Sequence, residues 1–401
     1  MTLILTLNRR GEGVADDGRA VPGALPGDVA GDLPLAARAA PICGYFGVCG
    51  GCAAQHMPAE LYAAWKRDAV VDALAREGVK AEVGALVDAH GAGRRRATFH
   101  ARALTDGAVE VGFMRARAHD IVEIDACPLF APELESAPVV ARALAEALKG
   151  LGKPLDIQVT ATLAGPDVDL RGSGLLGAGQ TRKLLAVAER FDLARLSNHG
   201  VALIERRPPL VALGRARVVP PAGGFLQATA AGEEALARLA GEAVNSAARV
   251  ADLFCGAGAF ALRLAERHAV FAADSDAAAI TSLRRGAAET PGLMGVEAVA
   301  RDLFRMPLAA VELSRFDAVL FDPPRAGAER QSLEIAASGV RLVVAISCNT
   351  DTFARDAHAL TAAGYVAEQV TPLDQFRYSP HVEIFAVFRR RAVKRRRGVL
   401  G

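Results

Sequence analysis

Two chemically reactive side chains each follow an apolar run near the C-terminal end of the chain. Asp322 comes directly after Ala318–Phe321 and begins the sequence Asp-Pro-Pro-Arg, and Cys348 follows Leu342–Ile346 within Ser-Cys-Asn. Short continuous apolar runs are typical of the buried strands of a parallel sheet. Ligands of such sheets bind beyond the carboxyl ends of the strands. We therefore expect a carboxylate and a thiol to lie side by side in an active site.

A glycine-rich turn lies upstream, between an expected strand over Val250–Phe254 and an expected helix over Ala259–Arg267. Gly256 and Gly258 allow the backbone to approach a ligand closely, and the start of the helix favours a negatively charged group. Asp274 ends the next expected strand, where a carboxylate can bind ribose hydroxyls. The pattern predicts a cofactor that contains a nucleoside; an ordinary strand–helix turn is the alternative.

Four of the six cysteines lie outside this C-terminal region. They are Cys43, Cys49, Cys52 and, far downstream, Cys127. Four soft ligands suit a tetrahedral zinc ion or an iron–sulfur cluster, and the residues alone do not choose between the two. Two unrelated groups of buried cysteines would be a third interpretation.

The composition is that of an ordinary globular protein of two or three domains. The net charge of the 401 residues is only +2, so the overall charge does not indicate a nucleic-acid partner. Only local clusters of basic residues could indicate one. Such clusters are Arg94–Arg96, Arg115 with Arg117, and the terminal run Arg389–Arg397. No uncharged apolar run is long enough to span a membrane, and the start lacks signal-peptide features, so we expect a cytoplasmic protein.

The distribution of the expected elements divides the chain into three parts. Residues 1–40 contain a short β segment, and residues 41–215 mix strands and helices in an α+β pattern. Residues 216–401 alternate strand and helix, which predicts an α/β fold with a parallel, doubly wound sheet. The proline-rich stretch before residue 222 marks the boundary between the last two parts.

Taken together, the motifs resemble those of the RNA uracil-C5 methyltransferase family. They are VADLFCGAG, the strand-ending Asp274, Arg301-Asp302, LFDPPRAG, ISCNT and the terminal HVEIF, in family order over roughly residues 41–390. The resemblance implies a C-terminal Rossmann-like, class I methyltransferase domain that uses S-adenosylmethionine. It also implies that uridine carbon 5 becomes nucleophilic only after a thiolate adds to carbon 6.

The resemblance also assigns roles to residues of the C-terminal part. It implies that Cys348 is the nucleophile, that Glu383 is the base that removes the carbon-5 proton, and that Asp322 positions the uracil ring. Phe225 is expected to stack on the target base. The expected cofactor contacts are Gln227, Phe254, Gly256, Gly258, Asp274, Asp302 and Asp322.

For the rest of the chain, the resemblance implies a [4Fe–4S] cluster on Cys43, Cys49, Cys52 and Cys127, in preference to zinc. Arg94, Arg96 and Arg115 are expected to contact structured RNA. The cysteine pattern is similar to that of the 23S rRNA branch, so 23S rRNA is the first expected substrate and tRNA the second. A cytosine-C5 methyltransferase and a non-catalytic RNA-binding iron–sulfur scaffold are the alternatives, and no protein partner is indicated.

The chain also departs from the family pattern. The opening matches only about half of the TRAM domain, a small RNA-binding β-barrel, so independent RNA binding by residues 1–40 is not expected. Ala259 and Thr229 replace the usual asparagines, and Thr350 replaces the usual proline after Ser-Cys-Asn. We expect a less rigid catalytic loop and fewer cofactor hydrogen bonds, with the reacting groups retained.

Overall fold

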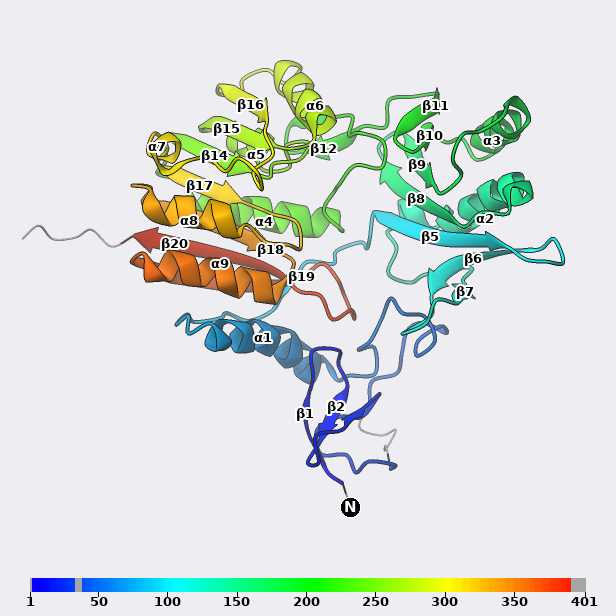
Figure 1. Ribbon diagram of the computed structural model, residues 1–401, viewed down its shortest axis with the longest axis horizontal. Helices are drawn as coiled ribbons and strands as arrows, with labels where there is room; N and C mark the ends of the chain where they lie inside the picture. The colour runs from blue at the N-terminus through cyan, green and yellow to red at the C-terminus, as the bar shows by residue number, and fades with distance from the viewer. Residues whose placement is uncertain (1, 33–37, 391–401) are drawn as a thin grey trace, which may run out of the picture.

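The structure, a computed structural model, describes residues 2–32 and 38–390. Most of the basic run Arg389–Arg397 therefore lies outside the described residues. The described chain forms sheets of eight, seven, three and two strands. Figure 1 shows the eight-stranded sheet on the left, the seven-stranded sheet on the right and the N-terminal strands below. No helix in the described ranges has both the length and the apolar character that crossing a membrane requires.

The eight-stranded sheet has the order β16-β15-β14-β17-β18-β20-β19-β4. The expected parallel pairing holds from β16 to β18, but β20 runs antiparallel to both of its neighbours. The loop 375–382 that joins β19 to β20 is too short for a crossover helix, so β20 returns directly between β18 and β19. The strands are β4 (Val87–Asp88), β14 (Arg249–Leu253), β15 (Ala269–Asp274), β16 (Val296–Ala300), β17 (Ala318–Phe321), β18 (Leu342–Ser347), β19 (Tyr365–Asp374) and β20 (Glu383–Arg390).

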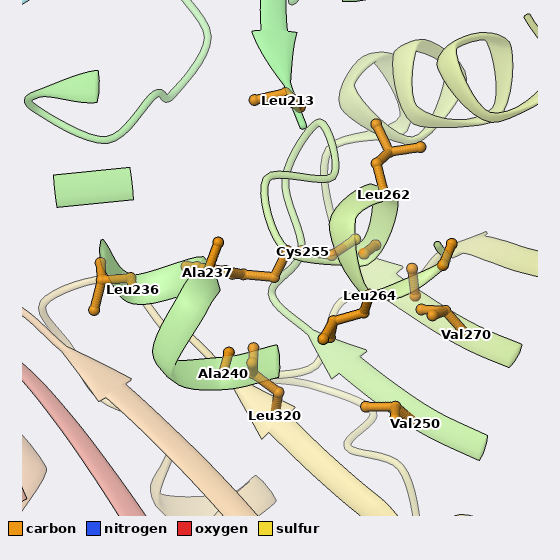
Figure 2. Packing of buried hydrophobic residues seen from close by; sticks show 14 of the residues in the cluster. Leu213, Leu236, Ala237, Ala240, Val250, Cys255, Leu262, Leu264, Val270 and Leu320 are labelled. Carbon is orange, nitrogen blue, oxygen red and sulfur yellow. The ribbon is translucent and has the colours of Figure 1, made fainter. Parts of the chain in front are cut away.

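Helices cover both faces of this sheet, as expected for a doubly wound fold. One face packs against α4 (Ala230–Ala243), α5 (Ala261–Leu264) and α6 (Ala277–Ala288). Figure 2 shows part of that core, with Ala240 of α4 next to Leu320 of β17 and with Leu236 of α4 and Leu264 of α5 in the same cluster. The other face packs against α1 (Ala59–Arg76), α7 (Ala310–Leu313), α8 (Glu329–Ala337) and α9 (Thr350–Ala362).

The seven-stranded sheet has the order β11-β10-β9-β8-β5-β6-β7 and is mostly antiparallel. Its core is closed by α2 (Ala137–Leu148) and α3 (Ala178–Arg190). Two short 3₁₀ turns, Pro132–Leu134 and Lys149–Leu151, flank α2. The strands are β5 (Arg96–Ala103), β6 (Val109–Met114), β7 (Ile121–Glu123), β8 (Leu155–Thr162), β9 (Gly165–Arg171), β10 (Arg195–Asn198) and β11 (Val201–Glu205).

The remaining strands form two small sheets. The N-terminal β1 (Ile4–Leu7), β2 (Gly13–Ala15) and β3 (Ala20–Val21) pair antiparallel, and β12 (Val211–Leu213) pairs with β13 (Ala216–Val218). The N-terminal strands rest on α1, where Trp65 Nε1 donates to the Asn8 carbonyl at 2.9 Å. Both α1 and β4 fall within the range 41–215 yet pack on the eight-stranded sheet. The division at residues 40 and 215 therefore stays a prediction.

Candidate active site

Three reactive side chains lie together at one edge of the eight-stranded sheet. Asp322 follows β17 and Cys348 follows β18, which pair in parallel, so both lie beyond carboxyl ends of adjacent strands. Glu383 begins the antiparallel strand β20, and the pairing of Ser347 with Ile384 places it across from Cys348. The structure therefore brings together the three residues for which the sequence predicts catalytic roles.

Two glutamine amides connect the two carboxylates. Gln227 Nε2 donates a hydrogen bond of 2.9 Å to Asp322 Oδ2. Gln375 Nε2 donates to Gln227 Oε1 at 2.9 Å and to Glu383 Oε2 at 2.6 Å. Both amides are at least 97% buried, so water does not compete for these bonds. Gln227 is one of the cofactor contacts expected from the sequence. Gln375 was not expected at the site, because it carries no motif signal of its own.

Burial raises the pKa of all three reactive groups, and repulsion by neighbouring carboxylates adds to the effect for Glu383 and Cys348. Burial raises the pKa of Asp322 to about 7, opposed by the hydrogen bond from Gln227. Burial, and then the charge of Asp322, raise the pKa of Glu383 well above its usual range. Burial raises the pKa of Cys348 to about 11, helped by Glu383 and Asp322 and opposed by the Arg325 guanidinium. A carboxylate with a raised pKa is a stronger base, which suits proton abstraction.

Arg325 and His381 border the reactive groups on their exposed side. Arg325, the last residue of Asp-Pro-Pro-Arg, lies with its guanidinium 3.1 Å from His381 Nε2. Burial and this neighbouring cation lower the pKa of His381 to about 4, so its ring is neutral at physiological pH. A neutral ring that contacts Arg325 fits a structural role for His381 better than a catalytic one.

The glycine turn between β14 and α5 has the backbone geometry of a ligand-binding turn. Phe254 has a φ of 62°, an unusual left-handed conformation for a residue with a side chain. A Cβ atom at Gly256 would meet no other atom, so this part of the turn is open. A Cβ atom at Gly258 would lie 2.3 Å from Leu283 Cδ1, so that glycine is required by the packing of α6. Asp274 accepts from the backbone N–H of Gly256 at 2.9 Å.

Asp302 lies beyond β16, and its carboxylate caps the turn that follows. Asp302 Oδ1 accepts from the backbone N–H groups of Phe304 and Arg305 at 3.0 and 3.2 Å. The ring of Phe304 lies 5.5 Å from that of Phe254. Asp302 Oδ2 lies 3.5 Å from Arg305 Nε. Asp302 thus caps a turn, and because a carboxylate has about four acceptor positions it can still accept from a ligand.

Phe225 is an exposed aromatic residue and does not belong to a hydrophobic core. Its exposed fraction is 65%, and the Arg96 guanidinium lies 5.4 Å from its ring centroid. Arg94 lies 6.0 Å from the ring of Phe376 in the loop before β20. Between them Arg95 forms an ion pair with the buried Glu233, so it is structural. Arg94 and Arg96 thus contact aromatic rings of the loops that precede β20 and α4, and both also line the cavity of the four cysteines.

The four N-terminal cysteines line one cavity. Cys43, Cys49, Cys52 and Cys127 share a volume of about 330 Å³ with Arg94, Arg96 and several apolar side chains. Within residues 2–32 and 38–390, no group of three or more His, Cys, Asp or Glu side chains has an arrangement that could hold a metal ion. The donor set nonetheless fits an iron–sulfur cluster, whose irons each take a thiolate. The cluster remains a prediction.

A basic groove of about 710 Å³ adjoins the cysteine cavity. Its walls come from the N-terminal strands, the cysteine segment, the β6–β7 hairpin and Pro380 in the loop before β20. The side chain of Arg115 is half exposed, with its nearest carboxylate, Asp120, at 3.9 Å. Arg117 forms an ion pair with Glu12 that joins the hairpin to the N-terminal strands. The lining arginines are Arg10, Arg94, Arg115 and Arg117.

Both the sequence and the fold resemble those of known RNA methyltransferases. Residues 220–391 match the family model described as tRNA (Uracil-5-)-methyltransferase. An uncharacterized RNA methyltransferase from Brucella suis is 45% identical over 96% of each chain. A 23S rRNA (uracil(1939)-C(5))-methyltransferase from Klebsiella pneumoniae is 33% identical over 88% of this chain and 82% of its own. The structure of a Pyrococcus abyssi tRNA (uracil-54, C5)-methyltransferase with S-adenosyl-L-homocysteine shares the fold, with a TM-score of 0.71 at 22% identity over 97% of this chain and 100% of that one.

Proposed function

Because the chain belongs to the RNA (uracil-5-)-methyltransferase family and is S-adenosyl-L-methionine-dependent, we propose that it methylates carbon 5 of a uridine through a covalent bond from Cys348 to carbon 6. The convergence of Cys348, Asp322 and Glu383 from three adjacent strands is the observation that carries this proposal. A thiol and two carboxylates are the groups that addition, orientation and proton removal require.

In the proposed reaction, the thiolate form of Cys348 attacks carbon 6 of uracil, and the electrons of the C5=C6 double bond move toward O4. Carbon 5 thereby becomes nucleophilic, and S-adenosyl-L-methionine, when bound, supplies the methyl group. Glu383 then removes the proton from carbon 5. The electrons released from the C5–H bond re-form C5=C6, the C6–S bond breaks and Cys348 leaves as a thiolate. Asp322 holds the ring in place throughout.

The carboxyl ends of β14 and β15 fit S-adenosyl-L-methionine. Gly256 leaves open space beside the turn. Each oxygen of Asp274 accepts one backbone hydrogen bond, from Gly256 and from Asp276, and a carboxylate has about four acceptor positions, so ribose hydroxyls can still bind. We propose that Phe254 and Asp302 border the adenosine and that Gln227 and Asp322 border the methionine end.

The four cysteines that line one cavity support the proposal of a [4Fe–4S] cluster. Iron and acid-labile sulfide, measured on protein purified without oxygen, should both be present. Cys127→Ser should lose both, whereas Cys255→Ser should keep them, because Cys255 is buried next to the glycine turn and outside the cavity. Zinc in place of iron, or equal iron content in the two variants, would contradict the cluster.

We propose structured 23S rRNA as the first substrate and tRNA as the second. The basic groove of about 710 Å³ beside the cysteine cavity supports binding of an RNA backbone. The name of the relative that is 33% identical supports the ribosomal choice. The target uridine must be unpaired or flipped out, because attack at carbon 6 needs the face of the ring. A cytoplasmic location is part of the same proposal.

An assay of methyl transfer from S-adenosyl-L-methionine to RNA tests the proposal. The RNA comes from a strain in which the gene for this protein is deleted, so that its target uridine is unmethylated. Nucleoside mass spectrometry should detect new 5-methyluridine, and mapping the uridines that lose it in that strain identifies the target. Cys348→Ala should abolish transfer. Glu383→Gln should accumulate a protein–RNA adduct that survives denaturation, because carbon 5 keeps its proton.

Each alternative predicts a different result in the same assays. Normal turnover by Glu383→Gln would refute its assignment as the base. A protein that binds RNA and iron but transfers no methyl group to rRNA or tRNA would be the non-catalytic scaffold. Appearance of 5-methylcytidine instead would point to the cytosine alternative.

A further inference from the structure

Gln375 occupies the centre of the polar network behind the reactive groups. Its Nε2 atom has two protons, and both are used: one on Glu383 Oε2 at 2.6 Å and one on Gln227 Oε1 at 2.9 Å. Gln227 in turn donates to Asp322. Gln375 is 99% buried, so water does not compete for these hydrogen bonds. A shift of Gln375 would move both carboxylates relative to the thiol.

The position of Gln375 is costly for stability. Its Oε1 atom is buried without a hydrogen-bond partner among the described residues. Such an atom costs about 1–3 kcal/mol. An apolar side chain of similar length would fill the same space without that cost, so packing does not explain an amide at this site.

A glycine in α4 makes room for this amide. A Cβ atom at Gly232 would lie 2.8 Å from Gln375 Oε1, 2.9 Å from Gln375 Cβ and 2.9 Å from Oγ1 of the N-cap residue Thr229, closer than side chains pack. Gly232 is helical, and a glycine inside a helix costs about 1 kcal/mol relative to alanine. Gln375 and Gly232 thus each lower the stability of the fold, and both are needed for the same placement of the amide.

We propose that Gln375 is a positioning residue: its amide orients the Glu383 carboxylate toward carbon 5 of the uridine and keeps it in register with Gln227 and Asp322 at the cofactor side. The inference rests on the proposed function, because it assumes that Glu383 removes the carbon-5 proton. Proton removal is then the step that a displaced Glu383 slows. Addition of Cys348 and methyl transfer come earlier and are affected less.

Two variants test the inference by different routes. Gln375→Met removes both donors at similar size, and Gly232→Ala keeps Gln375 but forces it to move. In each, kcat should fall roughly 10- to 100-fold, the effect of an ångström-scale misplacement, while KM for S-adenosyl-L-methionine changes little. A denaturation-resistant protein–RNA adduct should accumulate. With RNA that carries deuterium at uracil C5, the isotope effect on kcat should rise above that of the unmodified enzyme.

Gly241→Ala is the matched control, because it lies in the same helix and its Cβ would meet no other atom. Its kcat should stay within about twofold of the parent, since alanine only improves helix propensity. The inference is overturned if both test variants keep the parental kcat, or lose activity without adduct and without a larger isotope effect. If Gln375→Met does not fold, Gly232→Ala decides. An unmodified protein that makes no 5-methyluridine overturns the proposed function instead, and the inference with it.

Discussion

Three ionisable side chains in one buried site oppose each other's ionisation. Each negative charge on Asp322 or Glu383 makes a thiolate at Cys348 less favourable, and burial adds to the effect, so the pKa of Cys348 is raised to about 11. At neutral pH the sulfur therefore rests as a thiol. Arg325 is the positive group that lowers this pKa. Its charge should accordingly control how much reactive thiolate is present.

Replacement of Arg325 by methionine should slow the reaction of Cys348 with iodoacetamide. Loss of the positive charge raises the pKa of Cys348 further, so the thiolate fraction at pH 7.5 falls by about tenfold for one unit of pKa. Below both pKa values the ratio of variant to parent rate should be constant; it should begin to rise near the parental pKa of about 11 and approach one only above the higher pKa of the variant. Peptide mass spectrometry of the carbamidomethylated Cys348 peptide measures the rate.

Arg325→Lys is the control for this prediction, because it keeps the positive charge. It should restore most of the alkylation rate, although not the contact of the guanidinium with His381. An equal loss in both variants would show that Arg325 acts through geometry rather than charge.

At the scale of single residues, the sequence predicts which reactive side chains follow the strands and meet in the site. It does not predict which buried side chains hold those reactive groups in place. Asp322 and Cys348 could be expected to meet because parallel strands end at one edge. Gln375 could not, because its partners, Gln227 and Glu383, come from segments 148 and 8 residues away and meet only through the fold.

The N-terminal segment directly contacts the start of α9, next to Cys348, although its strands form only part of the expected barrel. Arg9 donates to Thr350 Oγ1 at 2.9 Å and to Asp351 Oδ1 at 2.6 Å, at the start of α9. Asn349, the residue after Cys348, caps the same helix by accepting from the backbone N–H of Asp351 at 3.0 Å. Thr350 replaces the proline that the family pattern carries, so Arg9 supplies a restraint that the proline ring would otherwise give.

Arg9→Ala should therefore loosen the Cys348 loop. The ion pair is exposed and worth no more than about 1 kcal/mol, so stability should change little and kcat should fall about two- to fivefold. Steady-state kinetics with saturating RNA, together with thermal unfolding, measures the two effects. Arg19→Ala is the control, because Arg19 pairs with Asp17 inside the N-terminal segment. A larger loss of kcat in Arg19→Ala than in Arg9→Ala would refute the restraint.

The antiparallel return of β20 shows what element patterns alone do not determine. Strand and helix alternation predicts the order of elements, but β20 inserts between β18 and β19 because the connecting loop has no helix. That insertion brings Glu383 beside Cys348. The position of the proposed base is therefore a property of sheet topology.

Over the whole molecule, the loop before β20 is where distant parts of the chain meet. The buried Lys66 of α1 donates to Asp374 Oδ1 at 3.0 Å and to the Phe376 carbonyl at 3.1 Å. Ala53 and Ala54, directly after the cysteine segment, donate to the Tyr378 carbonyl at 2.7 and 3.1 Å. The loop that leads to Glu383 is thus held by the segment directly after the cysteines. Order in the cysteine cavity and the position of the proposed base are linked through this loop.

The basic groove extends from the N-terminal strands to that same loop, so RNA bound there would lie next to the active site. Arg115→Ala should weaken binding of transcribed 23S rRNA and reduce the slope of log K against log salt by about 0.7–1, the effect of one lost phosphate contact. Filter binding over a salt series measures both. Arg238→Ala removes an equally exposed arginine on α4, paired with Glu242 and outside the groove, and should leave the slope unchanged. Equal changes in the two variants would mean that charge in general, rather than this groove, binds the RNA.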